Sequence, residues 1–229
     1  MAESTLPAPL HATLAVVFQV RGEALQVLMW ERARDPFKAM WALPGGYLER
    51  GDTLEQSIRR HLAAKVDVRE LAHLEQLETR SEPGRNPRAW ELATAYLGLV
   101  PAGLDPEVPT DTVWHPASAL PPAAFDHGEI VQAGLSRLRA KLSYTNIAFA
   151  LAPEVFTLSE LRTIYVAALG REVSATNLQR VLLRRGVLEQ TGAKREPGKT
   201  GGRPAELFRF RSQQLEVTDP FAVLKPRRR

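Results

Sequence analysis

The residues of this chain whose types and spacing bear most directly on chemistry lie between positions 46 and 68. Two adjacent glycines, Gly45 and Gly46, end an apolar run, and glycines permit a tight loop that a ligand can approach closely. Three acidic residues follow: Glu49, Asp52 and Glu55. Carboxylate oxygens are the ligands that hard divalent cations prefer, although acidic residues near a helix start also interact favourably with the helix dipole. The segment therefore has the layout of a metal-diphosphate site, and two roles stay open for its acidic residues.

A helix is expected directly after this loop. Thr53 is a suitable cap, Gln56 stands three residues later as its capping-box partner, and apolar residues recur at helical spacing at Leu54, Ile58, Leu62 and Val66. On such a helix positions 61, 64 and 65 share one face, because they are related by i, i+3 and i+4. That face presents the imidazole of His61, the methyl group of Ala64 and the ammonium of Lys65.

The order of strand, glycine loop and helix resembles the Nudix fold. The signature box of that family runs glycine, five residues, glutamate, seven residues, Arg-Glu, an apolar residue, any residue, Glu-Glu, any residue and a closing glycine. Asp52 replaces its first glutamate and Asp67 its closing glycine. Four residues fit the box: Gly46, Arg60, Leu62 and Val68.

The departures from the box fall on its chemistry. His61, Ala64 and Lys65 stand where the family's metal-binding glutamates stand. A hard cation prefers oxygen ligands, and Lys65 adds like-charge repulsion, so metal-assisted attack on a pyrophosphate is expected to be lost or severely weakened. The comparison with the box therefore implies a domain with no catalytic residues and no metal site.

Composition divides the chain into two parts of opposite charge. Positions 1–150 hold 15 Lys and Arg against 18 Asp and Glu, a net charge of −3, whereas positions 151–229 hold 15 against 8, a net charge of +7. A basic C-terminal module is typical of proteins that bind nucleic acid or another anionic surface. The absence of cysteine excludes disulfides and thiolate chemistry, and no apolar run approaches the roughly 20 residues of a membrane span. We therefore expect a cytoplasmic protein.

The N-terminal part shows the pattern of an α+β fold. Residues 12–20 and 25–30 are β-rich runs that predict a hairpin, and helical spacing returns over about 128–149. Further strands are expected at 41–46, 71–79, 90–100 and 112–115. The segment 151–154 is the expected break before a second domain.

After this break the pattern predicts a helix-turn-helix. Thr157 and Glu160 form a capping box, so one helix should run from Leu158 to Gly170, and a second can start after Ser174. A polar and basic outward face on the second helix suits entry into a major groove, although an ordinary amphipathic surface helix would show the same division. The residues of this face are Thr176, Asn177, Arg180 and Arg184.

Two strand-like runs at 187–192 and 205–211 flank a loop rich in glycine and cations, which resembles the wing of a winged helix-turn-helix. Glycines let a main chain lie against the sugar-phosphate surface, where cations neutralise phosphates or reach into the minor groove. The candidate DNA-binding residues of this wing are Lys194, Arg195, Lys199 and Arg203.

A degenerate Nudix domain followed by a basic winged helix resembles the Nudix-related transcriptional regulators of NAD metabolism, the NrtR family, over nearly the whole chain. The supporting strings are WALPGGYL, EQLETRSEPGRNPR, FDHGEI and FTLSELRTIYVAALGREVSATNLQRVLLRRGVL. The resemblance implies a Nudix-like α/β/α sandwich that senses a ligand over 1–150 and a winged helix-turn-helix that binds DNA over 151–229.

The same resemblance implies a homodimeric bacterial repressor of genes for NAD biosynthesis or salvage. Its partners would be a palindromic double-stranded operator and a nucleotide effector such as ADP-ribose, with no membrane partner and no required cofactor. A cleft of this shape can keep its binding contacts after losing its catalytic carboxylates, because binding and metal activation rest on different groups. The candidate ligand-binding residues are Arg32, Gly45, Gly46, Arg85 and Arg88.

Two other functions remain possible at this point. One is an active Nudix hydrolase, an ADP-ribose pyrophosphatase, whose basic domain is an accessory nucleic-acid-binding module. The other is an adaptor in which both domains bind proteins, although no motif supports it specifically. Release of AMP from ADP-ribose distinguishes the hydrolase from the repressor.

Overall fold

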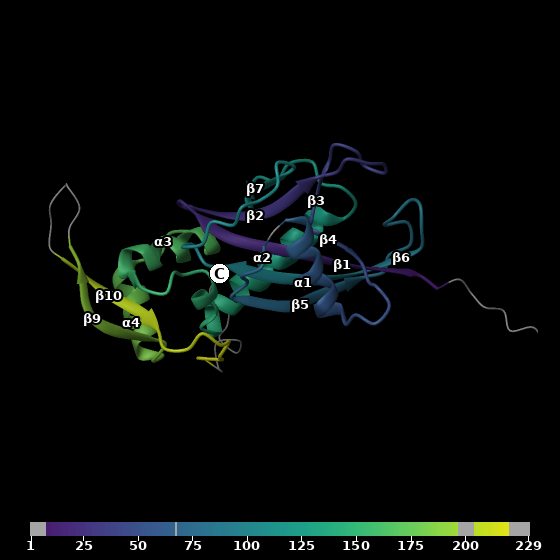
Figure 1. Cartoon of the computed structure of the whole chain (residues 1–229). Coiled ribbons are helices and arrows are strands. Elements are labelled where there is room, and N and C mark those ends of the chain that lie inside the picture. Colours follow the sequence, from purple (N-terminus) through teal and green to yellow (C-terminus); the bar gives the residue numbers. More distant parts are fainter. Residues whose placement is uncertain (1–7, 67, 197–203, 220–229) are drawn as a thin grey trace, which may run out of the picture.

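The computed structural model describes residues 8–66, 68–196 and 204–219 (Figure 1). Its N-terminal part contains seven strands and two helices, followed by the short 3-10 helix η1 over Ile147–Ala150. In chain order these elements are β1 Leu10–Arg21, β2 Ala24–Glu31, β3 Trp41–Ala42, β4 Gly45–Tyr47, α1 Leu54–Lys65, β5 His73–Arg80, β6 Glu91–Val100, β7 Thr112–Pro116 and α2 His127–Tyr144.

The seven strands form one mixed sheet with β1 at its centre. The strand order is β3-β2-β1-β6-β5, with β4 paired to β1 and β7 paired to β2. The pair β1 and β6 is parallel, and it aligns Leu10 with Glu91 and Gln19 with Val100, while the other pairs are antiparallel. Parallel pairing needs a long crossover, and here it is supplied by the segment that contains α1 and β5.

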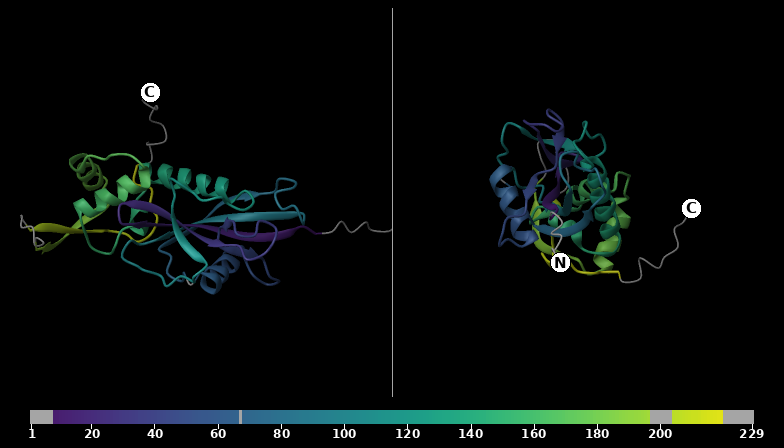
Figure 2. Two further views of the ribbon diagram at one scale, coloured as in Figure 1. Left: turned by 90° about the horizontal axis from the view of Figure 1, so that it is seen from above. Right: turned by 90° about the vertical axis from the view of Figure 1, so that its right-hand side faces the viewer.

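Helices cover both faces of the sheet, so the predicted α/β/α sandwich is confirmed (Figure 2, left). On one face Ala15 and Val17 of β1 pack with Ile58 and Leu62 of α1. The alternate residues of the same strand point the other way, because successive side chains of a strand lie on opposite faces. Residues Val16 and Phe18 therefore join α2 in a second cluster. Burial on both faces explains why β1 is apolar almost throughout.

The helix predicted over 128–149 is wrong in its second part, because α2 ends at Tyr144. Thr145 is extended, with φ −122° and ψ 175°, and its hydroxyl donates to Lys141 O at 2.7 Å. The Asn146 side chain then donates to Gln214 O at 2.8 Å and accepts from Glu216 N at 2.7 Å. These contacts with residues 68 to 70 positions away divert the chain into η1, and local sequence patterns carry no information about such partners.

The C-terminal part is a small winged helix fold (Figure 1). Its strands form a three-stranded antiparallel sheet in the order β8-β10-β9, and Phe156 and Phe210 pack within it with ring centroids 5.4 Å apart. The predicted capping box is confirmed, because Thr157 accepts from Glu160 N at 3.2 Å and donates its own N–H to Glu160 Oε2 at 2.8 Å. The elements are β8 Phe156–Thr157, α3 Leu158–Leu169, α4 Ala175–Arg184, β9 Leu188–Arg195 and β10 Ala205–Phe210.

One hydrophobic core runs through both parts. Val20 and Leu25 of the large sheet belong to the same buried cluster as Ile164 and Tyr165 of α3. Arg139 of α2 also donates to a main-chain oxygen near the end of α3, at 3.2 Å. Helix α3 is thus packed against the first domain as well as against its own. Within the described residues, no helix has the length and apolar character to cross a membrane.

Candidate functional sites

A cavity of about 720 Å³ opens where the glycine loop, the end of α1 and two long loops meet. Its wall includes the aromatic residues Trp30, Tyr47 and Phe125, together with three cations, Arg32, Lys65 and Arg88. A concave site with aromatic walls and a few charged groups is the usual form of a small-molecule site. This cavity is therefore the candidate ligand site.

The two glycines at the cavity wall are required by their surroundings. A Cβ on Gly45 would clash with the main-chain oxygen of Thr13, and one on Gly46 would lie 2.5 Å from Cε1 of His61. The imidazole of His61 fills this space because its Nε2 lies 3.0 Å from Tyr47 O. The structure thus places both predicted glycines at the cavity, with the α1 face close against Gly46.

The acidic residues before and within α1 are engaged by arginines. Arg60 is 2.9 Å from Glu49 and 2.7 Å from Asp52, and Arg59 is 2.9 Å from Glu55. Among the residues that the structure describes, no group of three or more His, Asp or Glu is arranged to hold a metal ion. In the described part of the chain these three carboxylates are thus occupied by ion pairs with Arg59 and Arg60.

Arg85, predicted to bind the ligand, is not among the residues that line the cavity. Its side chain is only 3% exposed, and its two terminal nitrogens lie 2.6 Å from Glu91 and 2.6 Å from Asp126. Glu91 in turn accepts from Tyr47 at 3.0 Å and from Asn86 at 2.7 Å. Arg85 thus connects Glu91 of β6 with Asp126 at the start of α2.

The other two predicted arginines do line the cavity. Arg32 lies over the Phe125 ring at 4.8 Å and donates to Pro36 O at 2.9 Å. Arg88 donates to Asp35 O at 2.8 Å and its residue is exposed. Within the described part of the chain, neither guanidinium group makes an ion pair with a carboxylate.

His127 at the cavity wall was missed by sequence reasoning, although it lies in the string FDHGEI. Its Nδ1 accepts from Leu43 N at 3.0 Å, so the neutral ring carries its proton on Nε2. Burial lowers the pKa of His127 to about 3. The ring is therefore a fixed hydrogen-bond donor across the whole physiological pH range.

We expect this histidine to make stability depend on pH. In the unfolded chain it takes up a proton as the pH falls through about 6.5, whereas in the folded protein it stays neutral until about 3, so the free energy of unfolding falls as the pH is lowered. His127→Asn keeps an acceptor for Leu43 N and removes the titration. Urea denaturation between pH 6.5 and 5 should give a shallower pH dependence for this variant, and an unchanged slope would contradict the assignment. This pH window lies above the range in which Glu75 contributes most to the pH dependence of stability. Burial alone would raise the pKa of Glu75, but His73 and Lys141 lower it to about 2.

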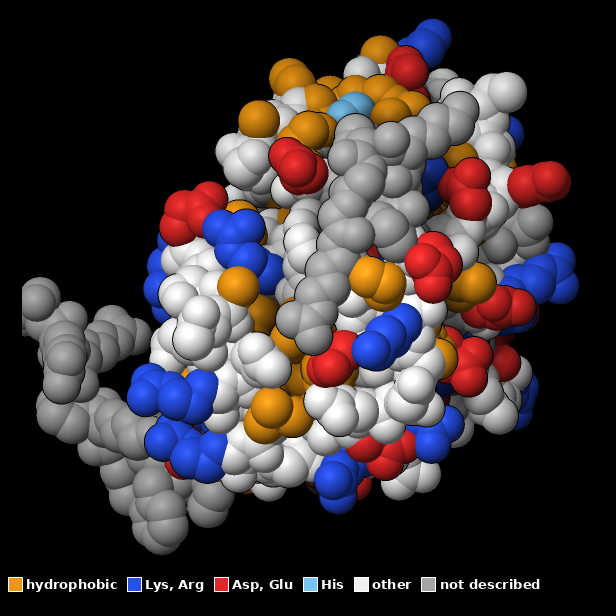
Figure 3. All heavy atoms as spheres, turned by 90° about the vertical axis from the view of Figure 1, so that its left-hand side faces the viewer, with side chains coloured by type: hydrophobic (Ala, Val, Ile, Leu, Met, Phe, Trp, Pro, Cys, Tyr) orange, Lys and Arg blue, Asp and Glu red, His pale blue; other side chains and the backbone are white. Residues whose placement is uncertain are grey.

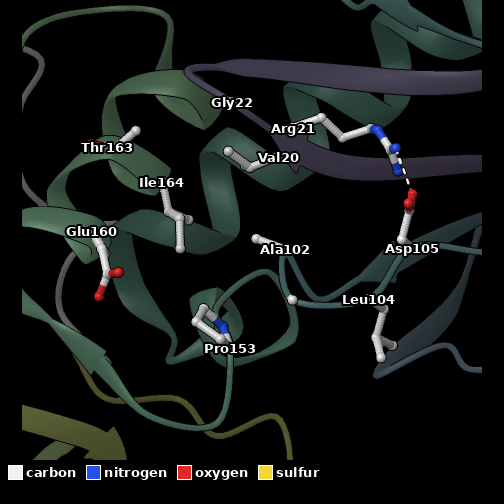
Figure 4. Close-up of a pocket in the computed structure, with 11 residues that line it drawn as sticks. Val20, Arg21, Gly22, Ala102, Leu104, Asp105, Pro153, Glu160, Thr163 and Ile164 are labelled. Carbon is white, nitrogen blue, oxygen red and sulfur yellow. Dashed lines mark hydrogen bonds and ion pairs between the residues drawn. The ribbon is translucent and has the colours of Figure 1, made fainter.

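A second cavity, of about 490 Å³, lies at the junction of the two domains (Figure 4). Its charged side chains already have partners. Arg21 is 2.6 Å from Asp105, and Glu160 pairs with Arg195 and caps α3. With no unpaired charge of its own, this cavity is a poorer candidate for an anionic ligand than the cavity at the glycine loop.

Helix α4 presents its predicted polar face to solvent. Leu178 and Leu182 are buried beneath it, and the Ser174 hydroxyl caps the helix by accepting from Asn177 N at 3.4 Å. Arg180 donates to Asn177 Oδ1 at 2.8 Å, which holds its guanidinium near the N-terminal half of the helix. The exposed residues of the face are those predicted: Thr176, Asn177, Arg180 and Arg184.

The wing is confirmed as the antiparallel pair of β9 and β10, but its cations differ in their contacts. Lys194 and Arg195 are both exposed, and Arg195 is also paired with Glu160 of α3. Lys199 and Arg203 lie outside the described residues. Seen from the winged helix end, Lys and Arg side chains are interspersed with Asp and Glu and do not form one uninterrupted patch (Figure 3).

Comparison with known proteins agrees with this architecture. A Nudix domain model matches residues 9–134, and a model of the NrtR DNA-binding winged helix domain matches residues 148–210. The ADPR responsive transcriptional repressor NtrR of Acinetobacter baylyi is 31% identical, over 98% of this chain and 91% of its own.

Two solved structures of Shewanella oneidensis NrtR are also similar. One, complexed with a 27mer DNA, has a TM-score of 0.75 and 30% identity over 87% of this chain and 93% of that chain. The other, its Nudix domain complexed with ADP ribose, has a TM-score of 0.54 and 30% identity over 60% of this chain and 94% of that chain.

Fold and comparisons together define a Nudix domain joined to a winged helix domain. The chain belongs to the NrtR family of transcriptional regulators.

Proposed function

We propose that this protein is a DNA-binding transcriptional repressor of genes for NAD biosynthesis or salvage, which senses an NAD-related nucleotide such as ADP-ribose without cleaving it. The ligand-sensing domain is assigned to 1–150 and the DNA-binding domain to 151–229. The observation that carries the proposal is the cavity at the glycine loop, which keeps cationic and aromatic binding groups while His61, Ala64 and Lys65 replace the metal-binding glutamates. A bound nucleotide that is not destroyed can report its concentration.

The proposed mechanism is a shift between conformations. The protein acts in the cytoplasm as a homodimer, and the two α4 helices occupy half-sites of a palindromic operator about 34 Å apart, one turn of DNA. A nucleotide in the cavity changes the relative orientation of the domains or subunits. The spacing of the two α4 helices then no longer matches both half-sites. Because α3 packs on the first domain, a change near the sheet has a direct physical connection to the DNA-binding part.

The proposal is tested by fluorescence anisotropy with labelled genomic fragments from upstream of NAD-related genes. We expect the purified chain to bind one such fragment more tightly than a scrambled duplex, and ADP-ribose to change that affinity. The salt concentration must be matched throughout, because phosphate contacts make affinity strongly salt-dependent. Equal affinity for palindromic and scrambled duplexes would count against the repressor.

The alternative of an ADP-ribose pyrophosphatase with an accessory nucleic-acid-binding domain is tested on the same preparation. AMP release from ADP-ribose is measured with Mg²⁺ or Mn²⁺. We expect no turnover above background, because the α1 face offers no carboxylate and the nearby carboxylates are held by Arg59 and Arg60. Brisk turnover combined with indifference to DNA would replace the repressor with the hydrolase.

A further inference from the structure

Lys65 is the last residue of α1 and stands where the Nudix box has a metal-binding glutamate. Its Nζ donates to Gly45 O at 2.6 Å and lies 5.5 Å from the centre of the Trp30 ring, so it is held against the cavity wall. The change from glutamate to lysine reverses the sign of the charge at this point. A divalent cation is repelled by it, whereas an anion is attracted.

A second cation lies on the same wall. Arg32 is 5.9 Å from the centre of the Trp30 ring and, like Lys65, lines the cavity. Burial lowers the pKa of Lys65 and that of Arg32, and the charge of Arg32 lowers the pKa of Lys65 further. Two cations that repel each other thus lie near the same aromatic side chain, Trp30.

Neither of these cations makes an ion pair within the described residues, although the charge of Glu91 acts on Arg32 from a distance and partly offsets the lowering of its pKa by burial. The cavity is lined by three acidic residues, of which Glu49 is paired with Arg60 and Glu91 accepts from Arg85, Asn86 and Tyr47. The third, Asp35, is exposed and makes no ion pair with either cation. Lys65 is exposed and Arg32 is half-buried, and both side chains line the cavity. Two cations of a cavity wall without an ion pair make the cavity favourable for an anionic ligand.

We propose that the Lys65 ammonium, together with Arg32, binds the diphosphate of the nucleotide directly and replaces the divalent metal ion of catalytic relatives. Nucleotide binding is therefore independent of Mg²⁺. The inference rests on the proposed function, since it names the group that holds the effector in the same cavity. We therefore expect the site to bind a diphosphate without the glutamates, because Lys65 itself supplies the positive charge that a metal ion would supply.

The test is isothermal titration calorimetry of the full chain with ADP-ribose and ADP, in excess EDTA and in Mg²⁺. We expect equal affinities in the two buffers. Lys65→Met, which keeps the apolar stem and removes the charge, should bind both nucleotides about 10- to 100-fold more weakly, the effect of losing one charge-assisted hydrogen bond. The affinity for adenosine, which has no phosphate, should change little in this variant. Lys65→Arg should restore most of the affinity.

Lys38→Met is the matched control, because it makes the same substitution at an exposed lysine of the same domain that does not line the cavity, and it should leave nucleotide affinity unchanged. Binding of the unmodified chain only in Mg²⁺ would overturn the inference and leave the proposed function standing. Unchanged affinity of Lys65→Met would also overturn it. Failure of the unmodified chain to bind ADP-ribose in either buffer would instead reject the proposed sensor. The comparison of EDTA with Mg²⁺ uses the unmodified chain, so it decides the question even if a variant folds poorly.

Discussion

Arg85→Ala is expected to destabilise the protein by about 3 to 5 kcal/mol, the range for breaking a buried ion pair by removing one partner. The Arg85 side chain is 3% exposed between Glu91 and Asp126, which are themselves 9% and 15% exposed. Its removal leaves two nearly buried carboxylates without their cation. For a chain of this size the melting temperature should fall by roughly 6 to 20 °C. Thermal unfolding followed by circular dichroism measures this directly.

Arg88→Ala supplies the matched comparison, because it also removes one arginine from the cavity region. Arg88 is exposed and its side chain donates a hydrogen bond to Asp35 O, so stability should change by no more than about 0.5 kcal/mol. Its effect should appear in ADP-ribose affinity instead. If Arg85→Ala kept its melting temperature and lost only nucleotide affinity, Arg85 would be a direct ligand contact, as the sequence suggested, and its structural role would be rejected.

The second large effect is expected for Arg180→Ala in DNA recognition. Arg180 is exposed on α4 and oriented by Asn177, and an arginine that contacts a base edge contributes about 1 to 3 kcal/mol of discrimination. The ratio of operator affinity to scrambled-duplex affinity should therefore fall by roughly 5- to 150-fold. Lys194→Ala should weaken both duplexes evenly and flatten the salt dependence by about one unit, as expected of a phosphate contact. Lys199 and Arg203 are expected to behave like Lys194.

The control for the Arg180 and Lys194 variants is Arg59→Ala. It removes the same charge from α1 of the Nudix domain and should leave DNA binding unaltered. The assignment of α4 as the recognition helix fails if Arg180→Ala lowers affinity for operator and scrambled duplex by the same factor. Anisotropy titrations at several salt concentrations separate the two patterns. Operator and scrambled duplex must have the same length so that the number of phosphates is equal.

Features set by neighbouring residues could be predicted from the sequence. The capping boxes Thr53 with Gln56 and Thr157 with Glu160 are confirmed, because each depends only on residues three positions apart. The order of strands, the glycine loop and the wing are also confirmed, since turn residues and alternation of apolar residues act locally. The residue spacing within α1 likewise predicted that His61 and Lys65 share one helix face, and both line the cavity.

Roles set by distant partners could not be predicted. Arg85 meets Asp126, which is 41 positions away, so its side chain is buried and does not line the cavity. Arg195 meets Glu160, which is 35 positions away, but it stays exposed on the wing. His127 gains its role from its hydrogen bond with Leu43 N, a main-chain group 84 positions earlier. Every residue except proline has such a group, so the sequence does not indicate this partner. Lys65 appeared in the sequence as a missing ligand, and only the structure shows that it faces a cavity beside Arg32.

The cluster that joins Val20 and Leu25 to Ile164 and Tyr165 has a consequence for genetics. The large sheet and α3 share one hydrophobic core, so we expect the proposed nucleotide site and the DNA-binding helix to depend on the same packing. A substitution in α3 that loosens this packing should therefore weaken both activities at once. Loss of repression in such a mutant does not by itself locate the altered residue at the DNA.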